Sequence, residues 1–292
     1  MRVLILGGNG MLGHKLVQAL GRDFETFTTI RRKFDAVERF GIFDEDKTIT
    51  GIDVTSPDQL TKAIKRAKPD VVINCVGIIK QVTSLPETMV QINTLLPIRL
   101  AELSSQYSFR LISMSTDCVF AGKKGNCSES DTPDATDAYG QTKLHGEVLQ
   151  DNCLTIRSSI IGRELDTRHS LIEWFLSQRN KTIDGYTGAI YSGFPTVIFA
   201  DMLSSLIKDH RELSGIFHIS SDPISKYDLL TIVNEAFGAN VTIRPDNSLV
   251  IDRSLDSTKF RAATGFAPPS WSEMIERMAA DTTPYERFHA AA

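Results

Sequence analysis

The sequence predicts an α/β protein with a doubly wound parallel sheet and, in its second half, a smaller mixed α/β domain. Two observations predict this fold class. From Met1 to about Gly162, short apolar runs that suit buried parallel strands alternate with segments of helical periodicity. The first apolar run, "RVLILGG", ends in a glycine-rich turn, and sheets of this class bind ligands at such strand ends.

The elements of the first half follow in order. Helical spacing of Leu12, Leu16 and Leu20 predicts a helix directly after the first strand. Ser56 is the predicted N-cap of the next helix, with Pro57 in its first turn. We expect strands at 2–8, 25–30, 48–54, 71–78, 110–120 and 154–162, and helices at about 12–20, 55–70, 88–107 and around Tyr139.

The second half is less regular. We expect helices at 170–178, 201–210, 227–237 and 270–280, strands at 215–220 and 240–245, and no regular structure in the tail at 281–292. The predicted domains are therefore 1–162, a dinucleotide-binding Rossmann domain, and 163–292, a smaller lid. Segments near 194–220 are expected to return to the first domain.

Composition excludes several classes of protein. The formal net charge of −4 and the absence of a long basic block argue against a nucleic-acid partner. The longest apolar stretch, "VVINCVGII", is about half the length of a membrane span, so no membrane association is expected. The four cysteines show no metal-ligand spacing, which predicts no metal site and a reducing, cytoplasmic location; they are Cys75, Cys118, Cys127 and Cys153.

The first turn carries a phosphate-binding pattern. In "LGGNGMLG", Gly7, Gly10 and Gly13 recur every three residues between a strand and a helix. Glycines let the backbone approach a pyrophosphate, and the helix N-terminus supplies free N–H groups. The loop, including Asn9 and Met11, is therefore a candidate dinucleotide site; the alternative is a glycine-rich turn without a ligand.

The choice of cofactor depends on the end of the second strand. An NAD site usually has an acidic residue there, but this sequence has "TTIRRK". Arg31 and Arg32 suit a 2′-phosphate, since a guanidinium makes paired, charge-assisted hydrogen bonds. The sequence therefore predicts NADP(H), the alternative being an ordinary basic loop.

A candidate catalytic pair stands in "DAYGQTKLHGE". Tyr139 and Lys143 are four residues apart, so both side chains lie on one face of a helix. A free Tyr, with a pKa of about 10, is a weak acid catalyst until its anion is stabilised, and a neighbouring ammonium supplies that stabilisation. The alternative is a surface Tyr and a surface Lys on an ordinary amphipathic helix.

With the glycine loop, "SMSTDCVFAG" and "YGQTK" in this order, the chain resembles the extended short-chain dehydrogenase/reductases, most closely the dTDP-4-dehydrorhamnose reductase branch. The resemblance implies NADPH-dependent reduction of the 4-keto group of a nucleotide-activated 6-deoxy sugar, in deoxysugar and polysaccharide biosynthesis. It implies that Tyr139 is the proton donor, that Thr116 hydrogen-bonds the same sugar oxygen, and that Lys143 also binds the cofactor ribose. The alternative for Thr116 is a loop cap, with Asp117 forming an Asx-turn.

Further candidate residues follow from the resemblance and from their places at strand ends. Asp53 and Val54 are expected at the adenine, Asn74 and Gly77 along the path of the cofactor, and Lys80 at the cofactor, as in nucleotide-sugar epimerases. Asp53 as a loop cap and Lys80 as a solvated residue are the alternatives. Arg163 and Arg253 are candidates for binding the substrate diphosphate, although scattered basic residues are common on surfaces.

Departures from the branch leave the nucleotide and the sugar open. Cys118 replaces a usual Tyr, Ala121 replaces an acid, and "VIDR" replaces an Arg-Pro before the C-terminal signature "SLDSTKF". Two other functions stay open: a nucleotide-sugar epimerase, and a non-catalytic NADP-binding subunit resembling the regulatory subunit of methionine adenosyltransferase. The number of subunits is also open, and a homodimer is one candidate.

Overall fold

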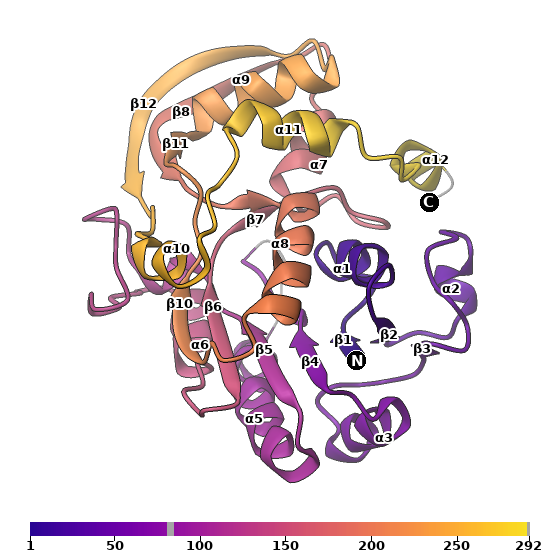
Figure 1. Ribbon diagram of the computed structural model, residues 1–292. Coiled ribbons are helices and arrows are strands. Elements are labelled where there is room, and N and C mark those ends of the chain that lie inside the picture. The colour runs from indigo at the N-terminus through magenta and orange to yellow at the C-terminus, as the bar shows by residue number, and fades with distance from the viewer. Residues whose placement is uncertain (81–84, 291–292) are drawn as a thin grey trace. The chain divides into compact units, whose positions relative to one another are not determined.

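The computed structural model describes residues 1–80 and 85–290, and the chain forms two compact units (Figure 1). The first unit comprises Met1–Ser115, Thr136–Ile156 and Ala200–Ile216. The second comprises Thr116–Ala135, Arg157–Phe199 and Phe217–Ala292.

A seven-stranded sheet runs through the first unit. Its spatial order is β10-β6-β5-β4-β1-β2-β3, and the pairings from β6 across to β3 are parallel. The order reverses between β1 and β4, which makes this pair the topological switch point where ligands bind in such sheets. The predicted doubly wound sheet is confirmed, with strands β1 (Arg2–Leu6), β2 (Glu25–Thr29), β3 (Thr48–Ile49), β4 (Val71–Asn74), β5 (Arg110–Met114), β6 (Cys153–Arg157) and β10 (Gly215–His218).

Helices alternate with these strands, as their apolar periodicity predicts. The helix α3 begins after Ser56 with Pro57 in its first turn, as expected. The long helix expected at 88–107 is present, but a π-helical turn, η1 (Val90–Leu95), interrupts it. The helices here are α1 (Gly13–Leu20), α2 (Asp35–Glu38), α3 (Pro57–Ala67), α4 (Pro86–Met89), α5 (Leu96–Tyr107), α6 (Ala138–His145) and most of α8 (Thr196–Asp209).

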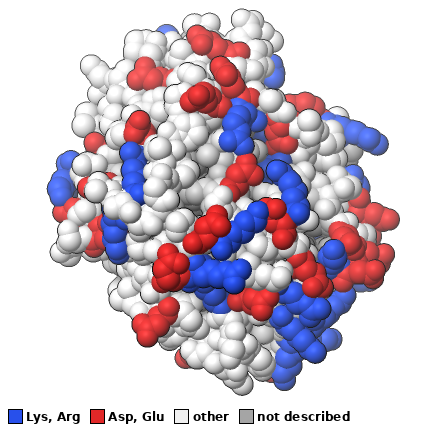
Figure 2. Space-filling view, in the orientation of Figure 1, with Lys and Arg blue, Asp and Glu red and all other residues white. Residues whose placement is uncertain are grey.

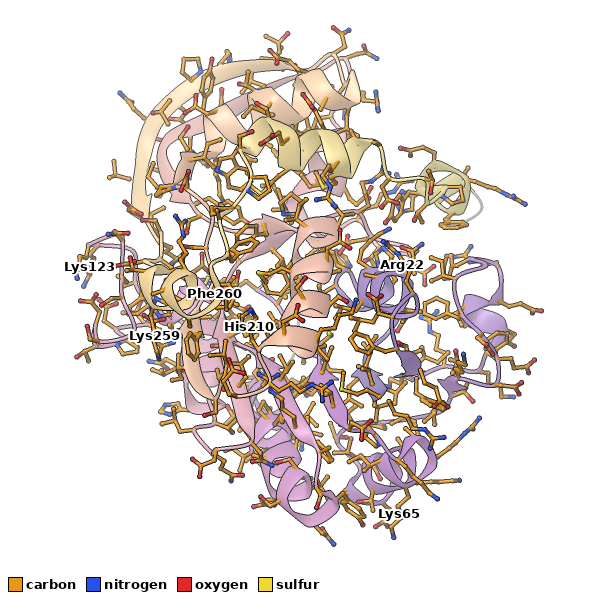
Figure 3. The ribbon with its side chains drawn as sticks, in the orientation of Figure 1. Arg22, Lys65, Lys123, His210, Lys259 and Phe260 are labelled. Atoms are coloured by element: carbon orange, nitrogen blue, oxygen red, sulfur yellow. The ribbon has the colours of Figure 1, made fainter. Side chains whose placement is uncertain are left out.

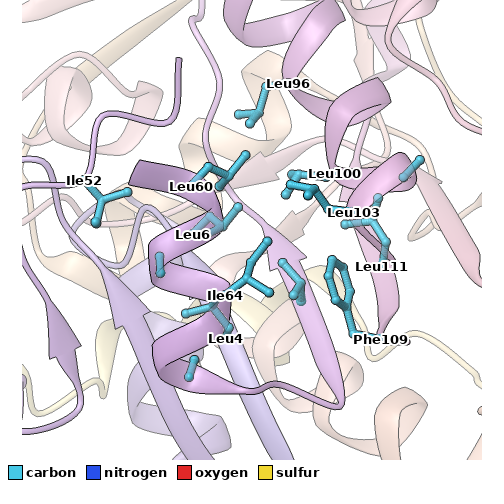
Figure 4. Close-up of a cluster of buried hydrophobic side chains, with 14 of the residues drawn as sticks. Leu4, Leu6, Ile52, Leu60, Ile64, Leu96, Leu100, Leu103, Phe109 and Leu111 are labelled. Carbon is cyan, nitrogen blue, oxygen red and sulfur yellow. The ribbon is translucent and has the colours of Figure 1, made fainter. Parts of the chain in front are cut away.

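A buried apolar cluster holds one face of this sheet to its helices (Figure 4). Leu4 and Leu6 of β1 lie in it with Leu60 and Ile64 of α3, and Leu100 contributes from α5. Complete burial of each such side chain stabilises the fold by roughly 2 kcal/mol. The cluster fixes the strands whose carboxyl ends carry the candidate site residues.

The second unit is mixed α/β, as predicted. It has a three-stranded sheet in the order β11-β8-β12 and a two-stranded sheet of β7 and β9. Its strands are β7 (Ile160–Ile161), β8 (Thr182–Tyr191), β9 (Phe194–Pro195), β11 (Ile224–Ser225) and β12 (Thr242–Asp252). Its helices are the 3₁₀ turn η2 (Asp117–Val119), α7 (Leu171–Leu176), α9 (Lys226–Phe237), α10 (Thr258–Thr264), α11 (Trp271–Ala279) and α12 (Tyr285–Ala290).

Two sequence predictions for the second unit were wrong. No strand was predicted at 182–191, where β8 forms the centre of the three-stranded sheet. The tail was predicted to be irregular, but residues 285–290 form α12, with Tyr285 and Phe288 buried.

The surface carries both signs of charge. On the face drawn in Figure 2, acidic and basic side chains are interspersed. Within residues 1–80 and 85–290, no helix has the length and apolar character needed to cross a membrane. The same residues contain no group of three or more His, Cys, Asp or Glu side chains arranged to hold a metal ion.

Candidate active site

The glycine loop between β1 and α1 has the geometry of a dinucleotide cradle. Gly7 has a φ of +81°, which only glycine adopts readily, and its N–H donates to Thr29 Oγ1 at 3.3 Å. A Cβ on Gly13 would lie 2.1 Å from the Gly7 carbonyl oxygen, so the helix start packs against the loop only because this side chain is absent. Asn9 and Gly10 are exposed and Met11 is half-buried, which leaves the turn accessible to a phosphate.

Arg31 and Arg32 lie in the loop after β2, and both are exposed. Arg31 is near Asp53, because its charge contributes to the lowered pKa of that carboxyl; hydrogen bonds from Thr55 are the larger cause. No acidic residue ends β2, since Glu25 is its first residue. The two exposed guanidinium groups therefore follow the strand end at which an NAD site usually has an acidic residue.

Asp53 closes its own loop. Its Oδ1 accepts hydrogen bonds from the Thr55 hydroxyl at 2.7 Å and the Thr55 N–H at 2.9 Å. This is the loop cap that the sequence left as an alternative. The next residue, Val54, packs its side chain against the apolar cluster below β1 and β4.

The carboxyl end of β4 leads to Lys80. Asn74 is buried, and its Oδ1 accepts from the Val76 N–H at 3.2 Å, while Gly77 is exposed. The Lys80 Nζ forms an ion pair with Asp137 Oδ2 at 2.6 Å and lies 5.7 Å from the centre of the Tyr139 ring. Lys80 is therefore tied to the start of the helix that carries Tyr139.

The helix α6 presents the candidate catalytic pair. Asp137 is its N-cap and accepts from the Gly140 N–H at 2.9 Å. Tyr139 is half-buried on the first turn, and Lys143 lies one turn later, 7% exposed.

Lys143 is held in a buried position. Its Nζ donates to the Met114 carbonyl at the end of β5. Burial lowers the pKa of Lys143 to about 8, while the charges of Glu147 and Cys75 act in the opposite direction. Burial likewise raises the pKa of the Cys75 thiol to about 12.

A buried amide in the turn η1 holds this helix in place. Asn93, in the π-helical turn η1, accepts from the Ile78 N–H at 2.9 Å and donates to the Ile78 carbonyl at 3.0 Å. It also donates to the Thr142 hydroxyl at 3.3 Å, and Thr94 donates to the Thr142 carbonyl at 2.7 Å. The loop after β4 and the helix α6 are thereby joined through η1, a link with no sequence signal besides the polar residue itself.

Thr116 belongs to the second unit, where it is 4% exposed and caps the turn η2. Its Oγ1 accepts from the Cys118 N–H at 3.2 Å and lies 3.1 Å from Asp117 Oδ1. Asp117 is also buried, at 6% exposure. The sequence did not assign Asp117 a part in the site.

The two candidate arginines of the second unit, and Lys259 of the C-terminal signature, differ in their surroundings. Arg163 is buried and forms ion pairs with Glu173 at 2.5 Å and Glu286 at 3.0 Å, an arrangement that favours a structural role. Arg253 donates from Nε to the Phe120 carbonyl at 3.0 Å, and no described residue binds its two terminal nitrogens. Lys259, on α10 (Figure 3), lies 4.0 Å from the centre of the Phe217 ring.

The chain is similar over most of its length to several known proteins. The chain is 24% identical over 316 residues to the dTDP-4-dehydrorhamnose reductase of Aggregatibacter actinomycetemcomitans, covering 96% of this chain and 98% of that one. It is 25% identical over 261 residues to the methionine adenosyltransferase 2 subunit beta of Rattus norvegicus, covering 81% and 72%. The structure of the Bacillus anthracis dTDP-4-dehydrorhamnose reductase in complex with NADP superposes with a TM-score of 0.77 at 22% identity, covering 96% and 99%.

The model of the family described as "RmlD substrate binding domain" matches residues 1–283. That match includes the glycine loop, the Tyr139 helix and nearly all of the second unit. The predicted resemblance to the extended reductases of nucleotide-activated sugars is confirmed, and the chain belongs to the RmlD substrate-binding-domain family.

Proposed function

We propose that the protein is an NADPH-dependent reductase of the 4-keto group of a nucleotide-activated 6-deoxy sugar, of the dTDP-4-dehydrorhamnose reductase type. The observation that carries the proposal is the pair on α6, a half-buried Tyr139 one turn from the buried Lys143. Full-length similarity to a reductase of this name supports it.

Binding of the cofactor is assigned to residues of the first unit. We assign the pyrophosphate to the loop with Gly7, Asn9, Gly10, Met11 and Gly13, whose exposed turn at the start of α1 suits an anion. We assign the 2′-phosphate to Arg31 and Arg32 and keep Asp53, Val54, Asn74, Gly77 and Lys80 as candidate contacts, while Tyr139 and Lys143 are assigned to the ribose. When bound, NADPH supplies the hydride that reduces the sugar carbon.

The proton that the sugar oxygen needs comes from a side chain of the protein. Tyr139 donates its phenolic proton to the sugar oxygen as hydride addition turns the carbonyl into an alkoxide. The Lys143 ammonium stabilises the phenolate that remains. Thr116 hydrogen-bonds the same oxygen and fixes its place. Arg253, with two terminal guanidinium nitrogens that no described residue binds, is the better supported of the two candidates for the substrate diphosphate.

NADPH oxidation followed by absorbance tests the proposal against dTDP-, UDP- and GDP-linked 4-keto-6-deoxy sugars, beside Tyr139→Phe. We expect turnover with one of these nucleotides, and we expect the variant to lose it while still binding NADPH. Tight NADPH binding without turnover on any of these sugars would contradict the proposal.

A second candidate function is a regulatory NADP-binding subunit without turnover. Similarity to the methionine adenosyltransferase subunit over 81% of this chain favours it. An epimerase is a third candidate, but the basic loop after β2 argues for an exchanging NADP(H) and against it. Absence of turnover together with a co-purifying partner protein would support the regulatory candidate.

We further propose a cytoplasmic homodimer that serves polysaccharide or other deoxysugar biosynthesis. None of the four cysteines, all within the described residues, forms a disulfide, as suits a reducing compartment. Apolar side chains are exposed along the α4–η1–α5 segment, which suits contact with a second copy; they are Leu85, Val90, Leu95 and Ile98. Sedimentation of the protein with Leu95→Glu beside the wild type tests the dimer.

A further inference from the structure

Two consecutive residues at the carboxyl end of β5 bind two charged side chains near the end of α6. The Met114 carbonyl accepts from Lys143 Nζ. The Ser115 hydroxyl donates to Glu147 Oε1 at 2.7 Å. Ser115 is 8% exposed, and its N–H donates to the Ile156 carbonyl in β6 at 2.7 Å, so the sheet fixes its position. The ammonium and the carboxylate are therefore both attached to the same strand end.

The turn after α6 sets the place of Glu147. Gly146 closes the helix, with its N–H donating to the Lys143 carbonyl at 3.1 Å. A Cβ on Gly146 would lie 2.0 Å from the Asn93 carbonyl oxygen, so the turn packs directly on η1. The dipole of a helix favours a cation at its C-terminus and disfavours a carboxylate there. Glu147 stands against this local preference, which indicates a role other than stabilising the helix.

The cation on which this carboxylate acts is Lys143. Lys143 is 7% exposed, and burial lowers its pKa to about 8, while the negative charge of Glu147 acts to raise it. Cys75, after β4, is the other group whose charge would act on Lys143. Burial raises the pKa of the Cys75 thiol to about 12, so that thiol is neutral at physiological pH. The charge that supports the ammonium at this pH is therefore that of Glu147.

Other titratable groups surround α6 at its surface. Besides Tyr139, those on the helix, at its N-cap and on the elements packed against it are exposed or half-buried; they are Lys80, Asp137, Glu87 and His145. Lys80 and Asp137 form an ion pair with each other, and η1 carries no charged side chain. Among the described residues, the carboxylate that influences the pKa of Lys143 is that of Glu147.

We propose that Glu147 is a positioning residue for the reduction, which keeps the buried Lys143 protonated at neutral pH and so keeps a cation beside Tyr139. This inference rests on the proposed function and deepens it. With a neutral lysine, the phenolate that Tyr139 leaves after donating its proton loses the ammonium one turn away. Glu147 acts on catalysis through Lys143 and has no contact with the sugar or the cofactor.

The pH dependence of kcat separates this role from a purely structural one. In Glu147→Gln, Lys143 should lose its proton at a pH lower by roughly one unit, and the alkaline limb of the kcat profile should move with it. We expect kcat to fall about tenfold at pH 9 and to stay within about twofold at pH 6. Glu147→Asp keeps the charge and should keep the alkaline limb of the wild type. Glu102→Gln, exposed on α5, is the matched control and should leave the profile unchanged.

A titration that needs no substrate tests the same coupling directly. NMR of protein labelled with ¹³C at lysine Cε follows the protonation of Lys143, whose signal is identified by its absence in Lys143→Met. The signal should titrate near pH 8 in the wild type and roughly one unit lower in Glu147→Gln. If that variant folds poorly, Ser115→Ala keeps the carboxylate but removes the hydroxyl that holds it, and should move the titration in the same direction by a smaller amount.

The outcomes separate this inference from the proposed function. A loss of kcat in Glu147→Gln that is equal at every pH, or an unchanged titration of Lys143, would overturn the role of Glu147 while turnover by the wild type still supported the reductase. If the wild type reduces none of the keto sugars, the proposed function fails. The role of Glu147 in catalysis then fails with it, whatever the NMR titration shows of its effect on the charge of Lys143.

Discussion

At the scale of single residues, the proposed catalytic residue Lys143 lowers the stability of the fold, because burial removes its charge from water. Its ammonium is buried, and the native state binds its proton more weakly than the unfolded chain, with a pKa of about 8 against 10.5. Between these two values the unfolded chain holds more protons, so this residue makes the free energy of unfolding rise with pH across that window.

Lys143→Met should therefore remove turnover and stabilise the protein at pH 7 by about 2 kcal/mol. The gain comes from deleting a buried charge and is reduced by the loss of the hydrogen bond to the Met114 carbonyl. The gain should shrink at pH 10, where the native lysine is already neutral. Urea denaturation at the two pH values measures both effects. Lys65→Met, at an exposed site on α3 (Figure 3), is the control. A gain that is equal at both pH values would show that the burial of charge is not its cause.

Arg32 has a different test, because its assigned partner is a phosphate that NADH lacks. Arg32→Ala should lower kcat/KM for NADPH roughly 10- to 100-fold, the equivalent of one charge-assisted hydrogen bond, and leave that for NADH nearly unchanged. The neighbouring exposed Lys33→Ala is the control. Equal losses with both cofactors would place Arg32 elsewhere than at the 2′-phosphate.

At the scale of elements, the π-helical turn η1 positions the helix that carries the catalytic pair. Asn93 satisfies both backbone groups of Ile78 and reaches Thr142 on α6. Asn93→Ala should destabilise the protein by about 2 to 3 kcal/mol, because those buried groups lose their partner, and should lower kcat more than the KM for NADPH. Gln91→Ala, exposed on the same turn, should do neither. Stability loss with an unchanged kcat would limit Asn93 to a structural role.

The helix α12 depends on an ion pair within the second unit. Glu173 is 3% exposed and matches the buried charge of Arg163, which also reaches Glu286 on α12. Glu173→Gln should lower the free energy of unfolding by about 3 kcal/mol, since a buried guanidinium loses its partner. Denaturation beside Glu276→Gln, an exposed site on α11, measures this. A loss no greater than that of the control would mean that water or Glu286 alone satisfies Arg163.

At the scale of the whole molecule, the predictions succeed where local pattern decides structure. The strands β1 and β4 are almost completely buried, so they appear as continuous apolar runs, and the glycine loop is confined to eight consecutive residues. The strand β8 is mostly exposed or half-exposed, with two Gly residues in "TIDGYTGAIY", and it contains no such apolar run. Its partners lie in β11 and β12, far along the chain.

Part of the candidate site can likewise be predicted from local sequence, and part of it cannot. Tyr139 and Lys143 are predictable because one helix turn places them together. The contacts of Lys80 with Asp137, and of Asn93 with Ile78 and Thr142, join segments 15 to 57 residues apart. Such contacts are products of tertiary packing, and no local spacing encodes them.

The measurement that tests the central claim most directly is the transfer of isotope from cofactor to sugar. The protein is incubated with NADPH deuterated at the transferable C4 position and with the 4-keto-6-deoxy sugar that it turns over, and the product is analysed by NMR. The account predicts one deuterium at C4 of the sugar for each NADP⁺ formed, and none with Tyr139→Phe. A sugar without deuterium, or one changed with no NADPH consumed, would contradict the reductase assignment.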